Sequence, residues 1–512
     1  MKSSIFKRNV FNSESIILCL LFVFSFSLHA QRGNNNGNNR NNFKQWSWEE
    51  VNNNANWSPR AGLQVLNHQN QFFLFGGRTP LDPASLPFPV PGASIIWGDV
   101  WKSQDYGNSW DNILQTDDET HWPARAYFQA VSKGDFMYII GGQNFNIVQN
   151  PGIPDLPPFF SQSEFFNDVW RSEDGANWTN MTEDAGWSGR AGLSAVVFNN
   201  DIYVMGGSVN DDSSITPSGP ARIYYNDVWK SENGADWELV TEHAAWAPRA
   251  GGVAVVKNGY IYMIGGEDGF ICNPQTPRCP PYYNDVWRTK NGVDWELVNE
   301  SCSWTARPGH QVVVAQNRFV LFGGFGLGPD ITIPANPMDI WISNNGSIWK
   351  KVSDSPWNAN NPSEIKYDFD AVVVEGDRNK SDMIFSFGGD RETFNFFDPF
   401  NYLNVDNDVW KFSYESGKKQ NRLKLNQKYP RPNSHRTVLN YEIPSKGDIV
   451  IEIYNLYGQL VKSFELSNQK AGKHKIDWDE NGSNGNKMKA GIYISKLIFK
   501  GNSVSNNILI KD

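Results

Sequence analysis

At 512 residues the chain is too long for one ordinary hydrophobic core, so two or more folding units are expected. Its 39% hydrophobic residues, 44 Gly, 28 Pro and 21 Trp favour a turn-rich, aromatic-rich β protein over a helical one. A net charge of −9 argues against a general nucleic-acid binder, because such proteins need clustered positive charge.

Residues 1–30 have the pattern of an export signal. Basic residues precede the apolar run "IILCLLFVFSFSLHA", which ends at the small residue Ala30. The run is short for a bilayer span and a polar tract follows at once. We therefore expect cleavage rather than a membrane anchor, and a mature protein that does not span the membrane. Residues 31–45 are almost all Asn, Gly and charged residues, which predicts a flexible linker.

Three short signatures then recur in a fixed order. The first is an apolar strand that ends in Gly-Gly, at Gly76-Gly77, Gly141-Gly142, Gly206-Gly207, Gly265-Gly266, Gly323-Gly324 and Gly388-Gly389. The second opens a strand with Asp-Val-Trp or Asp-Ile-Trp, at Asp99, Asp168, Asp227, Asp285, Asp339 and Asp408. The third is a Trp that opens an apolar strand after a polar turn, at Trp110, Trp178, Trp237, Trp295 and Trp349. The third signature is thus one copy short.

A further Trp strand, "SWEEV" at Trp48, stands alone before the first Gly-Gly strand. The last Asp-Val-Trp segment, which contains Trp410, has no Trp strand after it. The count is complete only if the two ends of the region pair. Each unit then has four strands, as the alternation of apolar and polar positions between tight turns also indicates. Residues 46–414 are therefore predicted to form an all-β, six-bladed β-propeller that is closed by its N-terminal strand.

These residues resemble Kelch repeats, in which a double glycine follows a hydrophobic strand and an aromatic residue is spaced behind it. The turn "SQDYGNSW" also resembles the Asp-box of sialidase-like propellers, and four later turns are one residue shorter. In both families these positions are structural. The double glycine permits backbone conformations that other residues resist, and the turn residues suit hairpins.

The composition and the pattern of apolar residues change after the repeats. Residues 415–428 are rich in Lys, Gln and Ser and predict a second linker, whereas residues 429–512 alternate like the strands of a small Ig-like β-sandwich. The second segment resembles the type A C-terminal sorting domain of the type IX secretion system of Bacteroidetes, through "YP" at its start, "IYNLYGQLV", "IDWD" and "GIYISKL". The resemblance implies export through the type IX translocon, removal of the domain by its sortase, and release or attachment at the cell surface.

Ligand binding is expected on the face where the first strand of each unit starts and the second ends. An arginine stands at five of these strand starts: Arg60, Arg125, Arg190, Arg249 and Arg307. Long aromatic inserts leave from the same face. The arginines, through bidentate hydrogen bonds, and the aromatic rings are candidates to hold an anionic or sugar-like ligand. Alternatively, the arginines pair with neighbouring acids such as Glu183 or Glu242, and the rings pack on one another.

An enzyme on the same fold stays open as the less favoured alternative: a glycan-modifying enzyme, sialic-acid epimerase-like or sialidase-like. The candidates for an acid or a base are four carboxylates just after Gly-Gly, namely Glu267, Asp268, Asp390 and Glu392. The competing interpretation is that they are exposed loop charges. No motif marks the arginine triad or the Tyr/Glu pair of a sialidase.

Cys272 and Cys279 in "CNPQTPRC" are expected to close a small disulfide loop in an oxidising compartment, which leaves Cys302 unassigned. No metal site or cofactor is expected, because there is no second close Cys pair and the seven His are scattered. The sequence thus predicts an exported, monomeric propeller, extracellular or attached to the outer-membrane surface, that binds an extracellular carbohydrate or peptide. It does not identify the ligand, because a fold does not fix a function.

Overall fold

The computed structural model describes residues 46–82, 85–86, 93–117, 119–150, 152, 158–209, 222–269, 281–327, 334–335, 338–357, 366–376, 381–391, 403–414, 423–428, 437–499 and 502–510. The regular elements in these ranges are all β-strands. No helix of sufficient length and hydropathy to cross a bilayer occurs among them. The predicted signal sequence and first linker lie outside the described residues.

In the described part of residues 46–414 there are six four-stranded antiparallel sheets, numbered in chain order. Sheet 1 contains β2 (Gln64–His68), β3 (Gln71–Pro80), β4 (Ser94–Ser103) and β5 (Asp111–Leu114); sheet 2 contains β6 (Gln129–Lys133), β7 (Phe136–Ile140), β10 (Val169–Ser172) and β11 (Thr179–Thr182). Sheet 3 contains β12 (Ser194–Phe198), β13 (Asp201–Met205), β16 (Val228–Ser231) and β17 (Glu238–Thr241); sheet 4 contains β18 (Val253–Lys257), β19 (Tyr260–Glu267), β20 (Tyr282–Thr289) and β21 (Trp295–Asn299). Sheet 5 contains β22 (His310–Ala315), β23 (Arg318–Gly323), β26 (Asp339–Ser343) and β27 (Trp349–Asp354); sheet 6 contains β28 (Asp370–Val374), β29 (Met383–Asp390), β30 (Val405–Tyr414) and β1 (Trp46–Asn52).

Three of the inserts that follow Gly-Gly contribute short two-stranded ribbons. Their strands are β8 (Asn146–Gln149) with β9 (Phe159–Gln162), β14 (Ser208–Val209) with β15 (Ile223–Tyr224), and β24 (Gly326–Leu327) with β25 (Pro334–Ala335). The ribbons extend from the ends of the second strands of sheets 2, 3 and 5.

The N-terminal strand completes the last sheet. β1 pairs antiparallel with β30, with Trp48 opposite Phe412 and Glu50 opposite Trp410. The ring of Trp48 stacks on Phe412 at 4.9 Å between centroids. The predicted pairing between the two ends of the region is therefore confirmed. It removes an open sheet edge that would otherwise be free to pair with other chains.

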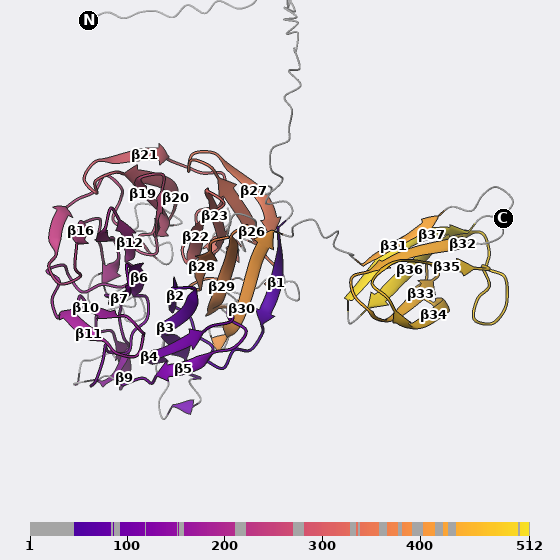
Figure 1. Ribbon diagram of the computed structural model, residues 1–512, viewed down its shortest axis with the longest axis horizontal. Helices are drawn as coiled ribbons and strands as arrows, with labels where there is room; N and C mark the ends of the chain where they lie inside the picture. Colours follow the sequence, from indigo (N-terminus) through magenta and orange to yellow (C-terminus); the bar gives the residue numbers. More distant parts are fainter. Residues whose placement is uncertain are drawn as a thin grey trace, which may run out of the picture. The chain divides into compact units, whose positions relative to one another are not determined.

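The first strands of the six sheets lie side by side around a central channel, each next to the first strand of the following sheet, and β28 lies next to β2 (Figure 1). Apolar side chains fill the space between neighbouring sheets, in clusters that draw on both. A buried tryptophan anchors each of these interfaces; they are Trp57, Trp122, Trp187, Trp246, Trp304 and Trp357.

The double glycines are structural, as their pattern predicts. Gly76 and Gly77 have φ values of 51° and 102°. A Cβ on Gly76 would lie 2.7 Å from the carbonyl oxygen of Arg125, and one on Gly77 would lie 2.9 Å from that of Ala61. Any side chain at these sites would meet backbone as well as take up a strained conformation.

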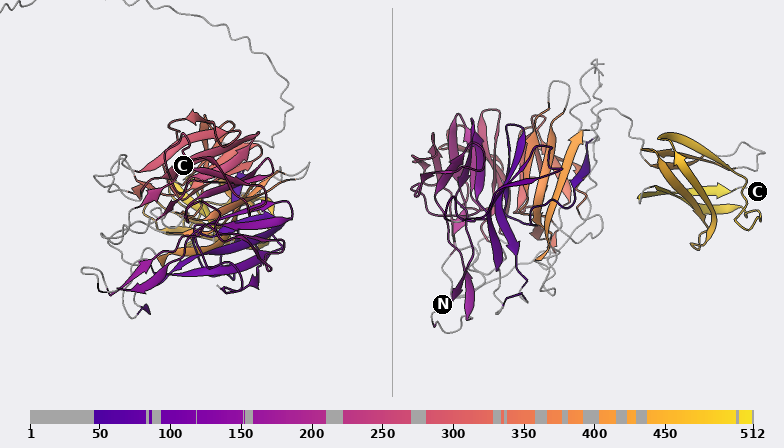
Figure 2. Two further views of the ribbon diagram at one scale, coloured as in Figure 1. Left: turned by 90° about the vertical axis from the view of Figure 1, so that its left-hand side faces the viewer. Right: turned by 60° about the horizontal axis from the view of Figure 1, so that its bottom comes forward.

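The C-terminal domain has two sheets that lie face to face (Figure 2). One contains β31 (Lys424–Lys428), β32 (Thr437–Ile443) and β35 (Gly472–Trp478); the other contains β33 (Gly447–Tyr454), β34 (Leu460–Gln469), β36 (Gly491–Phe499) and β37 (Asn502–Ile510). Trp478 and Leu439 are buried in its core. The predicted linker is too long, because residues 424–428 pair with β32 and Leu425 joins this core.

Candidate ligand site at the channel mouth

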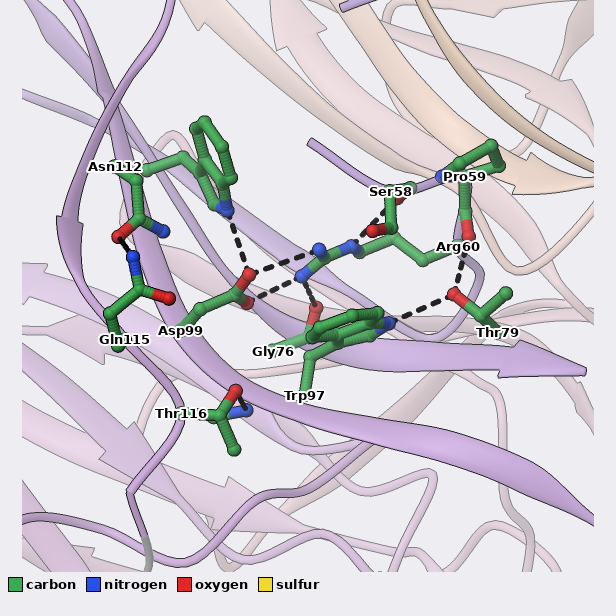
Figure 3. Close-up of polar contacts among 12 residues, drawn as sticks. Ser58, Pro59, Arg60, Gly76, Thr79, Trp97, Asp99, Asn112, Gln115 and Thr116 are labelled. Atoms are coloured by element: carbon green, nitrogen blue, oxygen red, sulfur yellow. Dashed lines mark hydrogen bonds and ion pairs between the residues drawn. The ribbon is translucent and has the colours of Figure 1, made fainter. Parts of the chain in front are cut away.

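The five arginines that begin the units are internal to the sheets, as Arg60 illustrates (Figure 3). Its Nη1 and Nη2 donate to the two carboxylate oxygens of Asp99 at 2.5 and 3.1 Å. Nη1 also donates to the carbonyl of Gly76 at 3.0 Å, and Nε donates to that of Ser58 at 2.9 Å. Trp97 covers the guanidinium, whose carbon lies 4.7 Å from the ring centroid. This arrangement uses the donors of Arg60 within the protein.

Each of the other four arginines pairs with the aspartate of its own Asp-Val-Trp or Asp-Ile-Trp strand, three of them through both Nη1 and Nη2 and Arg307 through Nη1. The pairs are Arg125–Asp168, Arg190–Asp227, Arg249–Asp285 and Arg307–Asp339. All five arginines are at most 1% exposed. Sheet 6 replaces arginine by Lys366, which lies 3.0 Å from Asp406 and 2.5 Å from Asp408.

These contacts correct the assignment of the five arginines as ligand contacts. A guanidinium that is buried and held by a carboxylate and two carbonyls has no open face for a ligand. The alternative partners Glu183 and Glu242 were also wrong, because the carboxylate comes from the Asp-Val-Trp strand. The tryptophan of the same signature donates to that carboxylate as well; in sheet 1, Trp101 Nε1 lies 2.7 Å from Asp99. The signature is therefore a buried ion-pair anchor.

The channel contains a cavity of about 410 Å³ that is lined by the first strands of all six sheets. Its polar wall includes Gln64, Gln129, Gln311 and Asp370. Asp370 is 7% exposed and accepts hydrogen bonds from the backbone N–H groups of Val65, at 2.6 Å, and Ala371, at 2.8 Å. Burial raises the pKa of Asp370 to about 7, although these two hydrogen bonds act in the opposite direction.

Arg78, Tyr127 and Asp390 meet at the mouth of this channel from three different sheets. Arg78 donates from Nε to the Tyr127 hydroxyl at 2.6 Å and from Nη2 to Asp390 Oδ2 at 2.7 Å. Burial acts to lower the pKa of Arg78, but Asp390, Tyr127 and Tyr367 together outweigh it and hold the pKa well above its usual value. Burial raises the pKa of Tyr127, so the phenol stays protonated. The Arg78 side chain is 15% exposed and Tyr127 is partly buried, whereas the Asp390 side chain is fully buried.

The four carboxylates considered as acid or base differ in their surroundings. Asp390 is fully buried in the ion pair with Arg78, which corrects its interpretation as an exposed loop charge. Glu267 is 8% exposed and lies beside Tyr282, whose pKa is raised by burial and then by the charge of Glu267. Asp268 accepts a hydrogen bond from the Tyr283 hydroxyl at 2.5 Å. Glu392 lies outside the described residues.

The cysteines and histidines do not form a metal centre in the part of the chain that the structure describes, where no group of three or more ligating side chains comes together. Cys302 is a buried thiol, and burial raises its pKa to about 12. His310 is buried as well, and burial, followed by the charge of Arg307, lowers its pKa to about 3. Cys272 and Cys279 lie outside the described residues, so their disulfide stays a prediction.

Sequence reasoning missed Arg78 and Tyr127. Arg78 directly follows Gly-Gly, and Tyr127 stands where most repeats have glycine two residues after the strand-start arginine. Tyr127 occupies this site with a φ of 55°, and Asp368 occupies the same site of sheet 6 with a φ of 51°. A bulky residue in the left-handed region is uncommon, so its replacement of glycine was an available signal.

Comparisons with known proteins match two parts of the chain. Residues 434–497 match the FlgD Ig-like domain family. A Kelch domain-containing protein of Sulfurisphaera tokodaii is 28% identical over 151 residues, which cover 29% of this chain and 18% of the relative. The Kelch repeat protein M-T8 of Myxoma virus is 23% identical over 181 residues, which cover 35% and 28%. The chain therefore spans less than a third of either relative.

A solved structure titled "Structure of YjhT" aligns with 70% of this chain and 96% of its own, at 14% identity and a TM-score of 0.46. Together with the all-β architecture, the similarity to Kelch-domain proteins supports a Kelch-type β-propeller, followed by an Ig-like domain.

Proposed function

We propose that residues 46–414 form a six-bladed Kelch-type propeller that binds an extracellular carbohydrate at the mouth of its central channel. The observation that carries the proposal is the convergence of Arg78, Tyr127 and Asp390 above a cavity lined by all six sheets. The closure into six blades is supported by the pairing of β1 with β30 and by the neighbouring positions of β28 and β2.

The charge balance at the mouth favours a neutral ligand over the anionic one that the arginines first suggested. The five strand-start arginines are neutralised inside the sheets, and the charge of Arg78 is offset by Asp390 at 2.7 Å. A cavity of about 410 Å³ is within the size range of small-molecule sites. Polar walls with both donors and acceptors suit the hydroxyl groups of a sugar, whereas a peptide would bring apolar side chains as well.

A glycan array with the full chain tests this proposal. Arg78→Lys keeps a positive charge beside Asp390 but removes the guanidinium fork that reaches Tyr127. We expect the wild type to bind neutral glycans and Arg78→Lys to bind them about tenfold more weakly, the loss that one hydrogen bond explains. Arg171→Ala is the matched control, because Arg171 packs on Phe136 away from the mouth. Equal binding by Arg78→Lys, or binding to peptides alone, would contradict the proposal.

A glycan-modifying enzyme is a second candidate, and the buried Glu267 beside Tyr282 favours it. A buried carboxylate and a neighbouring phenol are groups that can move protons. Incubation of the full chain with sialic acid and with sialylated oligosaccharides, followed by NMR, measures epimerisation and hydrolysis directly. Turnover that Glu267→Gln abolishes would replace the binding proposal by the enzymatic one.

We further propose that the chain is exported by the type IX system, with the translocon and sortase as partners of its C-terminal domain. The Ig-like match at residues 434–497 and the folded sandwich support a separate domain with its own core. In a host with this system, the full chain is expected in the medium or on the cell surface, and a chain that lacks residues 423–512 is expected in the periplasm. Export of the truncated chain would refute this role of the domain.

A further inference from the structure

The channel wall is encircled by backbone hydrogen bonds with one missing link. In five of the six sheets the residue two positions after the strand-start arginine or lysine donates to its counterpart in the preceding sheet. The five bonds are Gly62 to Asp368 (2.9 Å), Tyr127 to Gly62 (2.9 Å), Gly192 to Tyr127 (2.9 Å), Gly251 to Gly192 (2.9 Å) and Asp368 to Gly309 (3.1 Å). Among the described residues no such bond joins Gly309 of sheet 5 to Gly251 of sheet 4.

A second circle of side-chain bonds is interrupted at the same place. Its five links, made by side chains two positions further along, are Gln64 with Ala130, Gln129 with Ala195, Ser194 with Gly252, Gln311 with Phe369, and Asp370 with Val65. Sheet 4 has Val253 at this position, which has no polar atom to reach sheet 5. The seam between sheets 4 and 5 therefore lacks both links.

Pro308 is a further departure from the repeat beside this seam, within sheet 5. In sheets 1 to 4 an alanine follows the arginine and forms a β-bridge with the residue after Gly-Gly, as Ala250 does with Glu267. Pro308 replaces this alanine in sheet 5 and has no N–H to donate. One half of the bridge remains, from Phe325 N–H to the Pro308 carbonyl at 3.1 Å. Next to it, Arg307 Nη2 is buried without a hydrogen-bond partner, unlike its counterparts in sheets 1 to 4.

We infer that this gap is the subsite that receives a hydroxyl group of the ligand, an inference that rests on the proposed carbohydrate function. In a continuous circle the Gly309 N–H would donate to the Gly251 carbonyl. This bond is missing, so the gap offers one donor and one acceptor, and both residues line the cavity. A hydroxyl oxygen accepts one hydrogen bond and donates another at a single atom. It can therefore link the two groups and complete the circle.

The packing of the two strands on either side of the seam favours a hydroxyl over an amide. β18 and β22 remain neighbours, and Val253, Val255, Val312 and Val314 pack into one cluster at this interface. A trans amide carries its N–H and C=O on opposite sides of a rigid plane, so its insertion would require a wider separation than a single oxygen does. A sugar hydroxyl at this position would offer the two groups the same hydrogen bonds that solvent offers them.

The test uses two variants that close the seam. Pro308→Ala restores the alanine of sheets 1 to 4. Val253→Gln supplies the side chain found in sheets 1, 2 and 5, whose counterparts Gln64 and Gln129 accept a backbone N–H from the next sheet. Pro248→Ala is the matched control, because Pro248 is exposed and precedes Arg249 rather than following it.

The probes are the methyl glycosides of glucose, galactose and mannose and their monodeoxy analogues, titrated into the full chain by calorimetry. For the sugar that binds, we expect one deoxy analogue to lose about tenfold in affinity, as for one unmade hydrogen bond. Pro308→Ala and Val253→Gln are each expected to weaken the parent sugar by a similar factor and to abolish the difference between parent and analogue. Pro248→Ala should behave as wild type.

The outcomes separate this inference from the function on which it rests. If sugars bind but every deoxy analogue binds like its parent, or if both seam-closing variants keep the discrimination of the wild type, the gap holds only water and the inference is wrong. If neither these glycosides nor the glycans of the array bind, the carbohydrate function fails and the subsite fails with it. Selective NMR labelling of glycine adds a direct readout, because the Gly309 amide signal must shift more than that of Gly192 when the sugar binds.

Discussion

The buried carboxyl of Asp370 makes a quantitative prediction about pH. Its pKa rises from 3.8 to about 7 in the folded chain, mainly because of burial. The folded state therefore binds this proton more tightly than the unfolded state, and the contribution of the group to stability is complete below pH 4 and is lost as the pH rises toward 7. Each pKa unit corresponds to about 1.4 kcal/mol, so about 3 kcal/mol is lost between pH 5 and pH 7.

Asp370→Asn removes the titration and keeps an oxygen that can accept the Val65 N–H. Urea unfolding of wild type and variant at pH 5 and pH 8 gives the two free energies of unfolding. Tryptophan fluorescence follows the six-sheet region, because all tryptophans except Trp478 precede residue 423. We expect the variant to gain about 3 kcal/mol relative to wild type between the two pH values. Asp111→Asn, at an exposed position of β5, is the control for a change in charge alone.

A difference between wild type and Asp370→Asn that is the same at pH 5 and pH 8 would refute the reasoning. So would a difference of opposite sign, because it would mean that the folded state favours the ionised carboxylate. In that case the hydrogen bonds from Val65 and Ala371 would outweigh the burial of the group.

Three further predictions concern stability and reactivity. Trp48→Ala should lower the free energy of unfolding by about 3 kcal/mol, since it removes a partly buried ring that packs on Phe412, Phe322 and Trp357. A change below about 1 kcal/mol in urea titrations would contradict this packing. Arg190→Ala leaves Asp227, whose side chain is 16% exposed, without its cation and should cost about 3 kcal/mol, whereas a loss no larger than that of Arg171→Ala would contradict a buried ion pair. Cys302 should resist iodoacetamide at pH 8 in the folded chain and react in urea, because its thiol is buried and its pKa is about 12. Peptide mass mapping would show the label, and rapid labelling under native conditions would overturn this prediction.

The repeat could be predicted from the sequence because each signature has one local physical cause. Gly-Gly is required where any Cβ would meet backbone, and an unmatched Trp48 strand pairs with an unmatched Trp410 strand. The same reasoning fails for the site. The aspartate that neutralises each arginine lies 32 to 43 residues away in sequence, so spacing alone does not distinguish a buried ion pair from an open cation.

The groups at the channel mouth are set by exceptions to the repeat rather than by the repeat itself. Tyr127 takes the place of glycine and contacts Arg78 of another sheet, which the sequence of one unit alone does not predict. Pro308 takes the place of alanine and leaves half of a β-bridge within sheet 5. Similarly, Leu425 belongs to a strand because of a partner that comes later in the chain, although its neighbours have the composition of a linker.

The pairing of β1 with β30 also sets an order of events during synthesis. Asn54 and Asn407, which are hydrogen-bonded at 2.8 Å, are separated by 353 residues. A strand that leaves the ribosome first must therefore wait for its partner until nearly the whole region has been made, and until then the last sheet cannot form. A cut near either end would open the same sheet. The first and the last strand of the region to be synthesised thus complete its fold together.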